Sequence, residues 1–183
     1  MRELSLHILD IVQNSISATA SLINIYINEN LEGDLLTIKI RDNGRGIPEE
    51  QLLHITDPFY TTRTTREVGL GLSLFRQTAR RSGGGLEIKS QIGAGTEVTA
   101  FFAHSHIDRP PMGDIKGTLL TLIALNPDLD FTYQHLYRDR EFFLDTRVIK
   151  EELEGIEINQ QAVLDWLGEF IKKGLEDLYG GEG

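Results

Sequence analysis

RDNGRGIP, at positions 41–48, is the segment from which the fold of this chain is best inferred. It follows residues 35–40, in which apolar side chains occupy every second position, the pattern of a half-buried strand. Asp42 therefore ends a strand, and Gly44 and Gly46 follow it. A carboxylate there can accept from an amine, and the glycines let the backbone approach closely, which suits a flat polar ligand. Taken alone, the pattern also fits an ordinary surface turn.

Composition and charge exclude several classes of protein. The 183 residues are 40% hydrophobic, enough for a core, and include no cysteine, so disulfides and thiolate metal sites are excluded. Residues 104–183 carry 8 basic against 16 acidic side chains, which disfavours nucleic acid as a partner. No apolar run predicts a signal peptide or a membrane span. We therefore predict a cytoplasmic globular protein that acts without a membrane.

The segments around the RDNGRGIP box predict alternating helices and strands. Residues 2–20 have the apolar spacing of an amphipathic helix, and Pro48 with the acidic residues after it begins a short second one. Residues 57–68, DPFYTTRTTREV, show little periodicity and are predicted to form a surface loop. A further helix is expected over 73–81, and strands over 22–28, 35–40, 86–89 and 97–102.

Gly69 and Gly71, in the segment GLGL, come directly before the helix predicted over 73–81. Glycines at this place leave the first amide hydrogens of a helix free to meet an anion, where the helix dipole contributes up to roughly 1 kcal/mol. The segment is thus a candidate phosphate cradle, and plain loop chemistry is the alternative.

Together, four pieces of the sequence resemble the GHKL superfamily, the ATPases that include gyrase subunits, a heat-shock chaperone, mismatch-repair proteins and histidine kinases. The pieces are DIVQNSISATA, the DNGRGI box, DPFYTTR, and GLGL followed by GAGTEV. The resemblance spans residues 1–103. It implies an α+β fold, a two-layer α/β sandwich known as the Bergerat fold, in which helices cover a mixed sheet. The local pattern of residues 114–183 adds a small C-terminal helix-and-hairpin extension to this expectation.

The resemblance also implies ATP and Mg²⁺ as ligands and assigns roles to matching residues. Asn14 resembles the side chain that holds magnesium against the phosphates, and Asp42 the residue that reads adenine. Thr96 resembles the residue that assists this aspartate in binding adenine through a water molecule. Gly44 and Gly46 are expected to border the adenine pocket.

Four more matching positions lie in the glycine and lid segments. Gly69 and Gly71 are expected under the phosphates, and Phe59 is expected to anchor the lid. Arg63 is a candidate phosphate contact by its charge. The lid also departs from the family pattern, because Glu67 precedes Val68 and GLGL where related kinases carry an additional glycine.

Asp10 stands one helical turn before Asn14, where hydrolysing members of the superfamily carry a glutamate that activates water. The Asp10 carboxylate is therefore a candidate general base, although its side chain is one methylene shorter than that of glutamate. The alternative is that Asp10 only caps or solvates the first helix.

None of the five histidines precedes an acidic residue, as the phosphoacceptor of a histidine kinase generally does. We therefore expect any acceptor to lie on another protein and predict a regulatory protein kinase that acts in trans on a partner. One alternative is an ATP-gated binding module without chemistry, and another is a slow ATPase with Asp10 as general base.

The C-terminal part carries no assignable motif. We divide the chain into an ATP-binding domain at 1–103, a linker at 104–113 and an acidic helix-hairpin-helix extension at 114–183, a candidate unit for partner docking or a homodimer. His104, His106 and Asp108 share one face of the linker, as a metal site would require, or are simply exposed. The last helix is expected to begin at an Asn159 cap. Its apolar stripe is interpreted as core, with a docking surface as the alternative: Val163, Trp166, Leu167, Phe170, Ile171 and Leu178.

Overall fold

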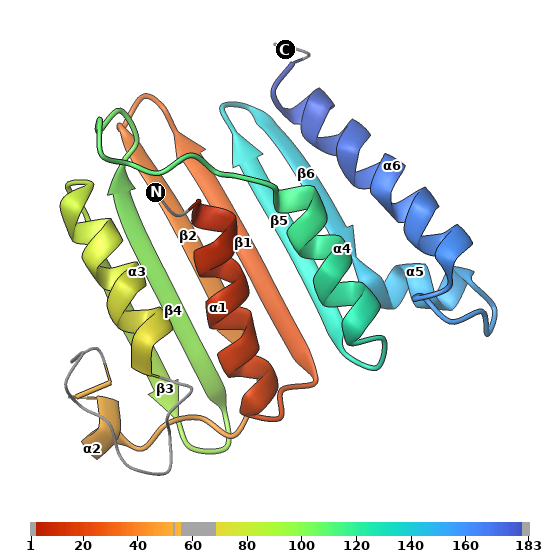
Figure 1. The fold of residues 1–183 in the computed structure, drawn as a ribbon, viewed down its shortest axis with the longest axis horizontal. Coiled ribbons are helices and arrows are strands. Elements are labelled where there is room, and N and C mark those ends of the chain that lie inside the picture. Colours follow the sequence, from red (N-terminus) through yellow and green to blue (C-terminus); the bar gives the residue numbers. More distant parts are fainter. Residues whose placement is uncertain (1–2, 53, 56–68, 181–183) are drawn as a thin grey trace.

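The computed structural model describes residues 3–52, 54–55 and 69–180. Six helices and six strands are assigned within this part of the chain (Figure 1). In chain order they are α1 (Leu4–Ser17), β1 (Leu22–Asn30), β2 (Leu35–Asp42), α2 (Glu49–Leu52), α3 (Gly69–Arg81), β3 (Gly85–Gln91), β4 (Gly95–Ala103), α4 (Ile115–Leu125), β5 (Asp130–Tyr137), β6 (Arg140–Asp145), α5 (Thr146–Glu152) and α6 (Gln161–Leu178).

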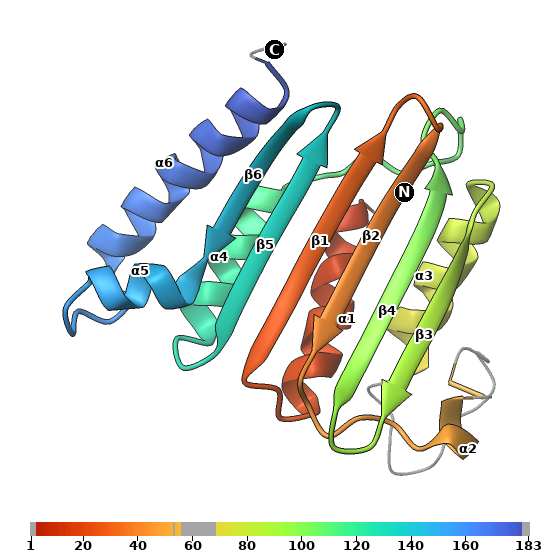
Figure 2. The same cartoon turned by 180° about the vertical axis from the view of Figure 1, so that it is seen from behind.

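The strands form one mixed sheet in the order β3-β4-β2-β1-β5-β6. The neighbours are antiparallel except β1 and β5, which run parallel and pair from Leu22 with Asp130 to Glu29 with Tyr137. Helices α1, α3 and α4 cover one face, and the view from behind shows the other face without helices (Figure 2). The fold is therefore the α+β sandwich of sheet and helices that the sequence predicted.

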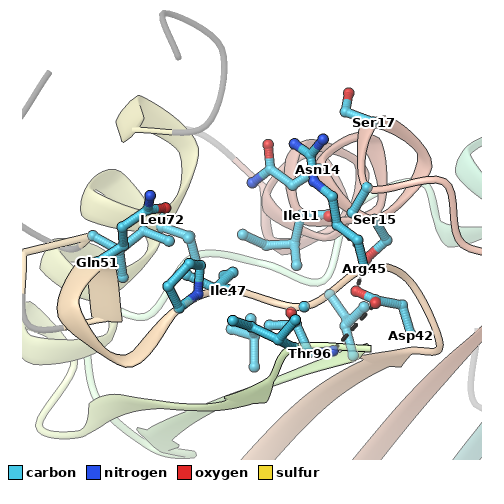
Figure 3. A pocket seen from close by; sticks show the side chains of 17 residues that line it. Ile11, Asn14, Ser15, Ser17, Asp42, Arg45, Ile47, Gln51, Leu72 and Thr96 are labelled. Carbon is cyan, nitrogen blue, oxygen red and sulfur yellow. Dashed lines mark hydrogen bonds between the residues drawn. The ribbon is translucent and has the colours of Figure 1, made fainter. Parts of the chain in front are cut away.

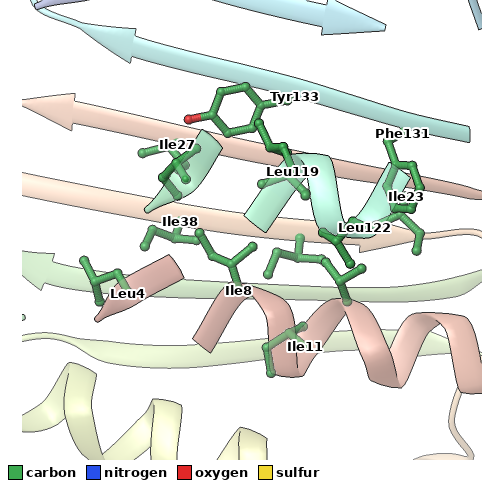
Figure 4. Close-up of a cluster of buried hydrophobic side chains, with 14 of the residues drawn as sticks. Leu4, Ile8, Ile11, Ile23, Ile27, Ile38, Leu119, Leu122, Phe131 and Tyr133 are labelled. Atoms are coloured by element: carbon green, nitrogen blue, oxygen red, sulfur yellow. The ribbon is translucent and has the colours of Figure 1, made fainter. Parts of the chain in front are cut away.

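The core lies between the sheet and its helices (Figure 4). Ile8 and Ile11 of α1 are buried against inward-facing residues of the sheet, such as Ile38 of β2, while Leu119 of α4 covers the neighbouring strands. The predicted alternation of β2 is confirmed, because Leu36 and the even-numbered residues after it are buried and face the helices. Burial of this kind contributes about 25 cal/mol per Å² of apolar surface.

The C-terminal part shares this sheet and this core. Strand β5 pairs with β1 from Leu22 to Glu29, and β6 completes the edge. The connection at 104–113 returns to the first helix, where the Leu4 and Ser5 amides donate to the carbonyls of Pro111 (3.0 Å) and Met112 (2.8 Å). The division at 103 and 113 stays a prediction, and across it the chain forms a continuous sheet.

Two helix starts differ from the sequence prediction. Helix α3 begins at Gly69, so the GLGL segment forms its first turn and does not precede it. Helix α6 is capped by Gln160 without a side-chain bond, so the predicted Asn159 cap is wrong. The helix is preceded by a turn in which the Gln160 amide donates to the Glu157 carbonyl at 3.1 Å, and Ile158 within this turn is buried. Asp114 does cap α4, since its carboxylate accepts from the Gly117 amide at 2.8 Å.

The apolar stripe of α6 is only partly core. Val163, Leu167 and Ile171 are buried, but Trp166 and Phe170 are 53% and 40% exposed and stack on each other with ring centroids 5.4 Å apart. The helix buries the side that meets α4 and β6. Phe170 also contacts Phe142 of β6, with ring centroids 5.7 Å apart, and leaves part of its ring exposed. A docking role for them stays a prediction.

A buried polar cluster joins β1 to the C-terminal part. Glu29, one residue beyond the strand predicted over 22–28, continues the inward alternation of β1 and is 6% exposed. Its carboxylate accepts from His104 (2.8 Å), from the wholly buried His135 (2.9 Å) and from the Tyr179 hydroxyl (2.5 Å). Tyr133 hydrogen-bonds the other ring nitrogen of His135 at 2.7 Å. This cluster therefore ties β1, β5 and the end of α6 together.

Candidate functional site

A cavity of about 440 Å³ opens at the end of the sheet where β2 leaves it (Figure 3). Its walls are largely aliphatic, and five of its described lining side chains are polar and uncharged, while two carry a charge. The described lining residues are Ile11, Asn14, Ser15, Ser17, Ala18, Ile40, Asp42, Arg45, Gly46, Ile47, Pro48, Gln51, Ile55, Leu72, Ile92, Thr96 and Val98.

Asp42 lies at the buried end of this cavity with its carboxylate held in place by three donors. Oδ1 accepts from the backbone amides of Gly44 (2.9 Å) and Thr96 (3.2 Å), and Oδ2 accepts from the Ser15 hydroxyl (2.6 Å). Asp42 is 6% exposed and lines the cavity, so its carboxylate is a buried acceptor at the cavity wall. A hydrogen-bond acceptor in this setting suits a ligand that presents an amine.

The strand period places Asp42 on this side. Because β2 buries every second residue, Asp42 points to the same face as the core residues before it. The glycines then let the loop pass close to its neighbours. A Cβ at Gly44 would lie 2.7 Å from the Ala18 carbonyl oxygen, and a Cβ at Gly46, which has φ +73°, would overlap the Gln91 carbonyl oxygen.

Alanine at Gly46 is expected to destabilise the protein by about 3 kcal/mol, because the left-handed backbone and the overlap with Gln91 both oppose a Cβ. Gly93→Ala is a matched control, since Gly93 has φ +77° but no atom within 4 Å of a Cβ, and we expect it to cost about 1 kcal/mol. Urea unfolding of both variants measures the difference. An equal decrease in the free energy of unfolding of both variants would show that the close approach of Gly46 to Gln91 adds nothing to the conformational strain.

Thr96 and its neighbours support the loop from the other side. The Thr96 hydroxyl lies 2.8 Å from the Ser90 hydroxyl, and Ser90 also accepts from the Ile47 amide at 2.8 Å. Ser90 donates in turn to the Gly95 carbonyl at 2.9 Å. These bonds connect β3, β4 and the loop after β2, so they fix the end of the cavity at which Asp42 lies.

Asn14 also borders a second hollow, on the α3 side of α1. Asp10, Asn14 and Gly71 line it together with Gln13, Ser17, Leu70 and Leu74. Gly71 allows the close packing here, since a Cβ on it would lie 3.2 Å from the Asp10 Cβ. The structure thus brings Asp10, Asn14 and the start of α3 together around one hollow. Gly69 lies in the same first turn of α3.

Sequence reasoning missed three residues of the site. Ser15 is 3% exposed and bonds Asp42 across 27 positions of sequence, Ser90 joins β3 to the loop, and Arg45 lines the cavity. A serine on the apolar face of α1, one turn after Ile11, was the available signal for the first. Phe59 and Arg63 lie outside the described residues.

The described residues contain no group of three or more His, Cys, Asp or Glu side chains arranged to hold a metal ion. The linker residues proposed for one are used otherwise, because His104 bonds Glu29 and the His106 ring nitrogen accepts from the Asp108 amide at 3.1 Å. In the same part of the chain, every helix is too short or too polar to span a bilayer.

Comparison with known proteins agrees with this geometry. The family described as Histidine kinase-, DNA gyrase B-, and HSP90-like ATPase matches residues 2–106, more than half of the chain. The chain therefore belongs to this family, and its N-terminal part is an ATP-binding domain related to the catalytic domains of histidine kinases.

Similar proteins include two sensor histidine kinases of Bacillus subtilis. YkoH is 40% identical over 74 residues, which cover 38% of this chain and 16% of that protein, and YclK is 39% identical over 97 residues, which cover 49% and 20%. The chain thus matches a fifth or less of each of these two relatives.

A solved structure shares the fold beyond the family region. The N-terminal domain of a DNA repair protein superposes with a TM-score of 0.58 at 17% identity, covering 79% of this chain and 53% of the other. Because 79% exceeds the share taken by residues 2–106, the common architecture extends into the C-terminal part.

The residues of the site fit the ligand that the family implies. A volume of about 440 Å³ lies in the range of small-molecule pockets, and aliphatic walls suit a flat base. The buried Asp42 acceptor can meet an exocyclic amine, and the Asn14 amide oxygen is a ligand type that Mg²⁺ accepts alongside phosphate oxygens and water. Magnesium needs no dedicated carboxylate cage in such a site.

Proposed function

We propose that this protein binds magnesium ATP in the cavity beside Asp42 and acts as a protein kinase in trans, transferring phosphate to a partner protein. The observation that carries the proposal is the buried Asp42 carboxylate, held by three donors at the end of an apolar cavity that Asn14 connects to a second hollow. This arrangement offers an acceptor for the base at one end and room for phosphates at the other.

Each residue then has a distinct task in the proposed reaction. Asp42 accepts from the adenine amine, while Thr96, whose amide donates to Asp42 at 3.2 Å, orients that carboxylate. The amides of the first turn of α3, including Gly71, have no partner within the helix and are proposed to face the phosphates. Magnesium, held through Asn14, supplies charge neutralisation when it is bound. Positioning and charge stabilisation of this kind account for most of the catalysis of phosphoryl transfer.

The similarity to sensor histidine kinases supports transfer over simple binding. The acceptor is proposed on a partner, because none of the five histidines precedes an acidic residue. Hydrolysis is the second candidate, favoured by the position of Asp10, which lines the same hollow as Asn14 and Gly71. A carboxylate there is close to the space proposed for the phosphates, where a general base must lie.

Asp10→Asn separates the two candidates. For a kinase in trans, we expect wild type and variant to bind Mg-ATP equally and to release little phosphate, while γ-labelled ATP with cell extract labels a discrete protein only when the active chain is present. Hydrolysis by Asp10 predicts phosphate release by the wild type that disappears in the variant while binding persists. Asp128→Asn, an exposed aspartate in the α4–β5 connection, is the matched control. Binding with neither release nor transfer would favour an ATP-gated binding module.

A further inference from the structure

Arg45 lines the cavity, although no sequence motif assigns it a role. Among the described residues that line the cavity, Asp42 and Arg45 are the two that carry a charge. The carboxylate is buried, whereas Arg45 is exposed at the open side. Figure 3 shows the Arg45 side chain extending from the loop toward the part of α1 that carries Asn14 and Ser15. The cavity therefore has a negative inner end and a positive outer side.

The backbone of Arg45 is fixed, so its side chain starts from a defined place. Its amide donates to the Ala18 carbonyl at 2.9 Å, and its carbonyl accepts from the Gly93 amide at 2.8 Å. The glycines on either side pack against Ala18 and Gln91 so closely that no Cβ fits there. The loop thus presents one guanidinium from a rigid base, as a binding residue requires.

The guanidinium is not used within the described part of the chain, where no ion pair and no side-chain hydrogen bond involves Arg45. By contrast, Arg147 is paired with Asp145 at 2.6 Å, and Arg109 donates to the His104 carbonyl at 2.6 Å. An arginine offers five donors in a planar fork that matches phosphate oxygens. Its five donors are therefore available to an anionic ligand at the open side of the cavity.

We infer that Arg45 binds a phosphate group of the nucleotide and makes the site selective for nucleoside phosphates over nucleosides. This inference rests on the proposed function, since it assumes a base at Asp42. A ligand with an amine at one end and a phosphate at the other matches the two charges of the cavity. Asn14 lines both this cavity and the second hollow, so the two spaces meet at the residue toward which Arg45 extends (Figure 3).

Affinities for Mg-ADP and for adenosine test the inference on the full chain. For Arg45→Gln we expect about tenfold weaker binding of Mg-ADP, because one charge-assisted contact is lost, with adenosine affinity unchanged. Arg45→Lys keeps the charge and should recover most of the loss. Arg41→Gln is the matched control, since Arg41 is also exposed but does not line the cavity. Calorimetry measures ADP, and NMR titration measures adenosine in the millimolar range.

Two results would overturn the inference. If Arg45→Gln weakened the binding of Mg-ADP and of adenosine equally, Arg45 would contact the base and not a phosphate. If its affinity for Mg-ADP were unchanged, Arg45 would not contact the nucleotide. If the wild type and Arg41→Gln both fail to bind Mg-ADP, the proposed function itself fails. Circular dichroism of each variant confirms that the exposed substitution leaves the fold intact.

Discussion

Asparagine in place of Asp42 is expected to weaken Mg-ADP binding about 100-fold while the protein stays folded. The amide oxygen of the new side chain can replace Oδ1 and keep the bonds from the Gly44 and Thr96 amides. Its NH₂ group then replaces Oδ2, so a donor meets the ligand amine where an acceptor is needed. A factor of 100 corresponds to about 2.8 kcal/mol, the size of a charge-assisted hydrogen bond lost together with an unpaired buried donor.

Calorimetry with Mg-ADP measures this loss, and thermal unfolding checks the fold. Asp128→Asn makes the same chemical change at an exposed position and should leave binding within twofold. Ser15→Ala removes only the hydroxyl that donates to Oδ2 at 2.6 Å, so we expect an intermediate loss of about fivefold. Undiminished binding by Asp42→Asn would mean that the base lies elsewhere.

The second large effect is expected at Glu29, far from the cavity. Burial raises the pKa of its carboxyl group, but the hydrogen bonds from His135, Tyr179 and His104 outweigh burial and hold the pKa at about 2, against 4.5 for the free side chain. Because the pKa of Glu29 is lower in the folded state than in the unfolded state, its ionised carboxylate stabilises the folded protein at pH values above 4.5. This stabilisation is lost as the pH falls from 4.5 toward 2. The shift corresponds to roughly 3 kcal/mol at pH 7.

Glu29→Gln resembles the protonated carboxyl group, so it should lower the free energy of unfolding by roughly 3 kcal/mol at pH 7 and the melting temperature by about 10 °C. The difference from wild type should stay constant between pH 7 and 5 and decrease below pH 4.5. Urea unfolding at pH 7, 5, 4 and 3.5 measures it, with the exposed Glu32→Gln as control. A difference that does not change down to pH 3.5 would contradict the ionised cluster.

Local sequence patterns were sufficient to predict the elements that build the site. Alternation over 35–40 predicted β2, and the same period places Asp42 toward the helices, because side chains of a strand point to alternate faces. The helical spacing of Asp10 and Asn14 predicted that both lie on one side of α1, and they line one hollow. The order of the motifs led to the family and hence to the α+β sandwich. Strand alternation and helical spacing are properties of short segments, so they can be recognised from the periodicity of the sequence.

Long-range partners were not predictable in this way. Nothing in the pattern of residues 130–137 indicates that they run parallel to β1, since pairing depends on packing between segments about 100 residues apart. The strand predicted over 22–28 ends one residue before Glu29, whereas the partners of the Glu29 carboxylate come from positions 104, 135 and 179. The bond between Ser15 and Asp42 has the same origin.

The sequence by itself thus determined the class of fold, the strand that carries Asp42 and the family of nucleotide-binding proteins. Only the tertiary structure decided that the C-terminal hairpin extends the same sheet, that a buried carboxylate joins it to β1, and that Arg45 faces the cavity. The physical reason is that local geometry fixes which face a side chain takes, whereas its partner on that face is chosen when distant elements pack together.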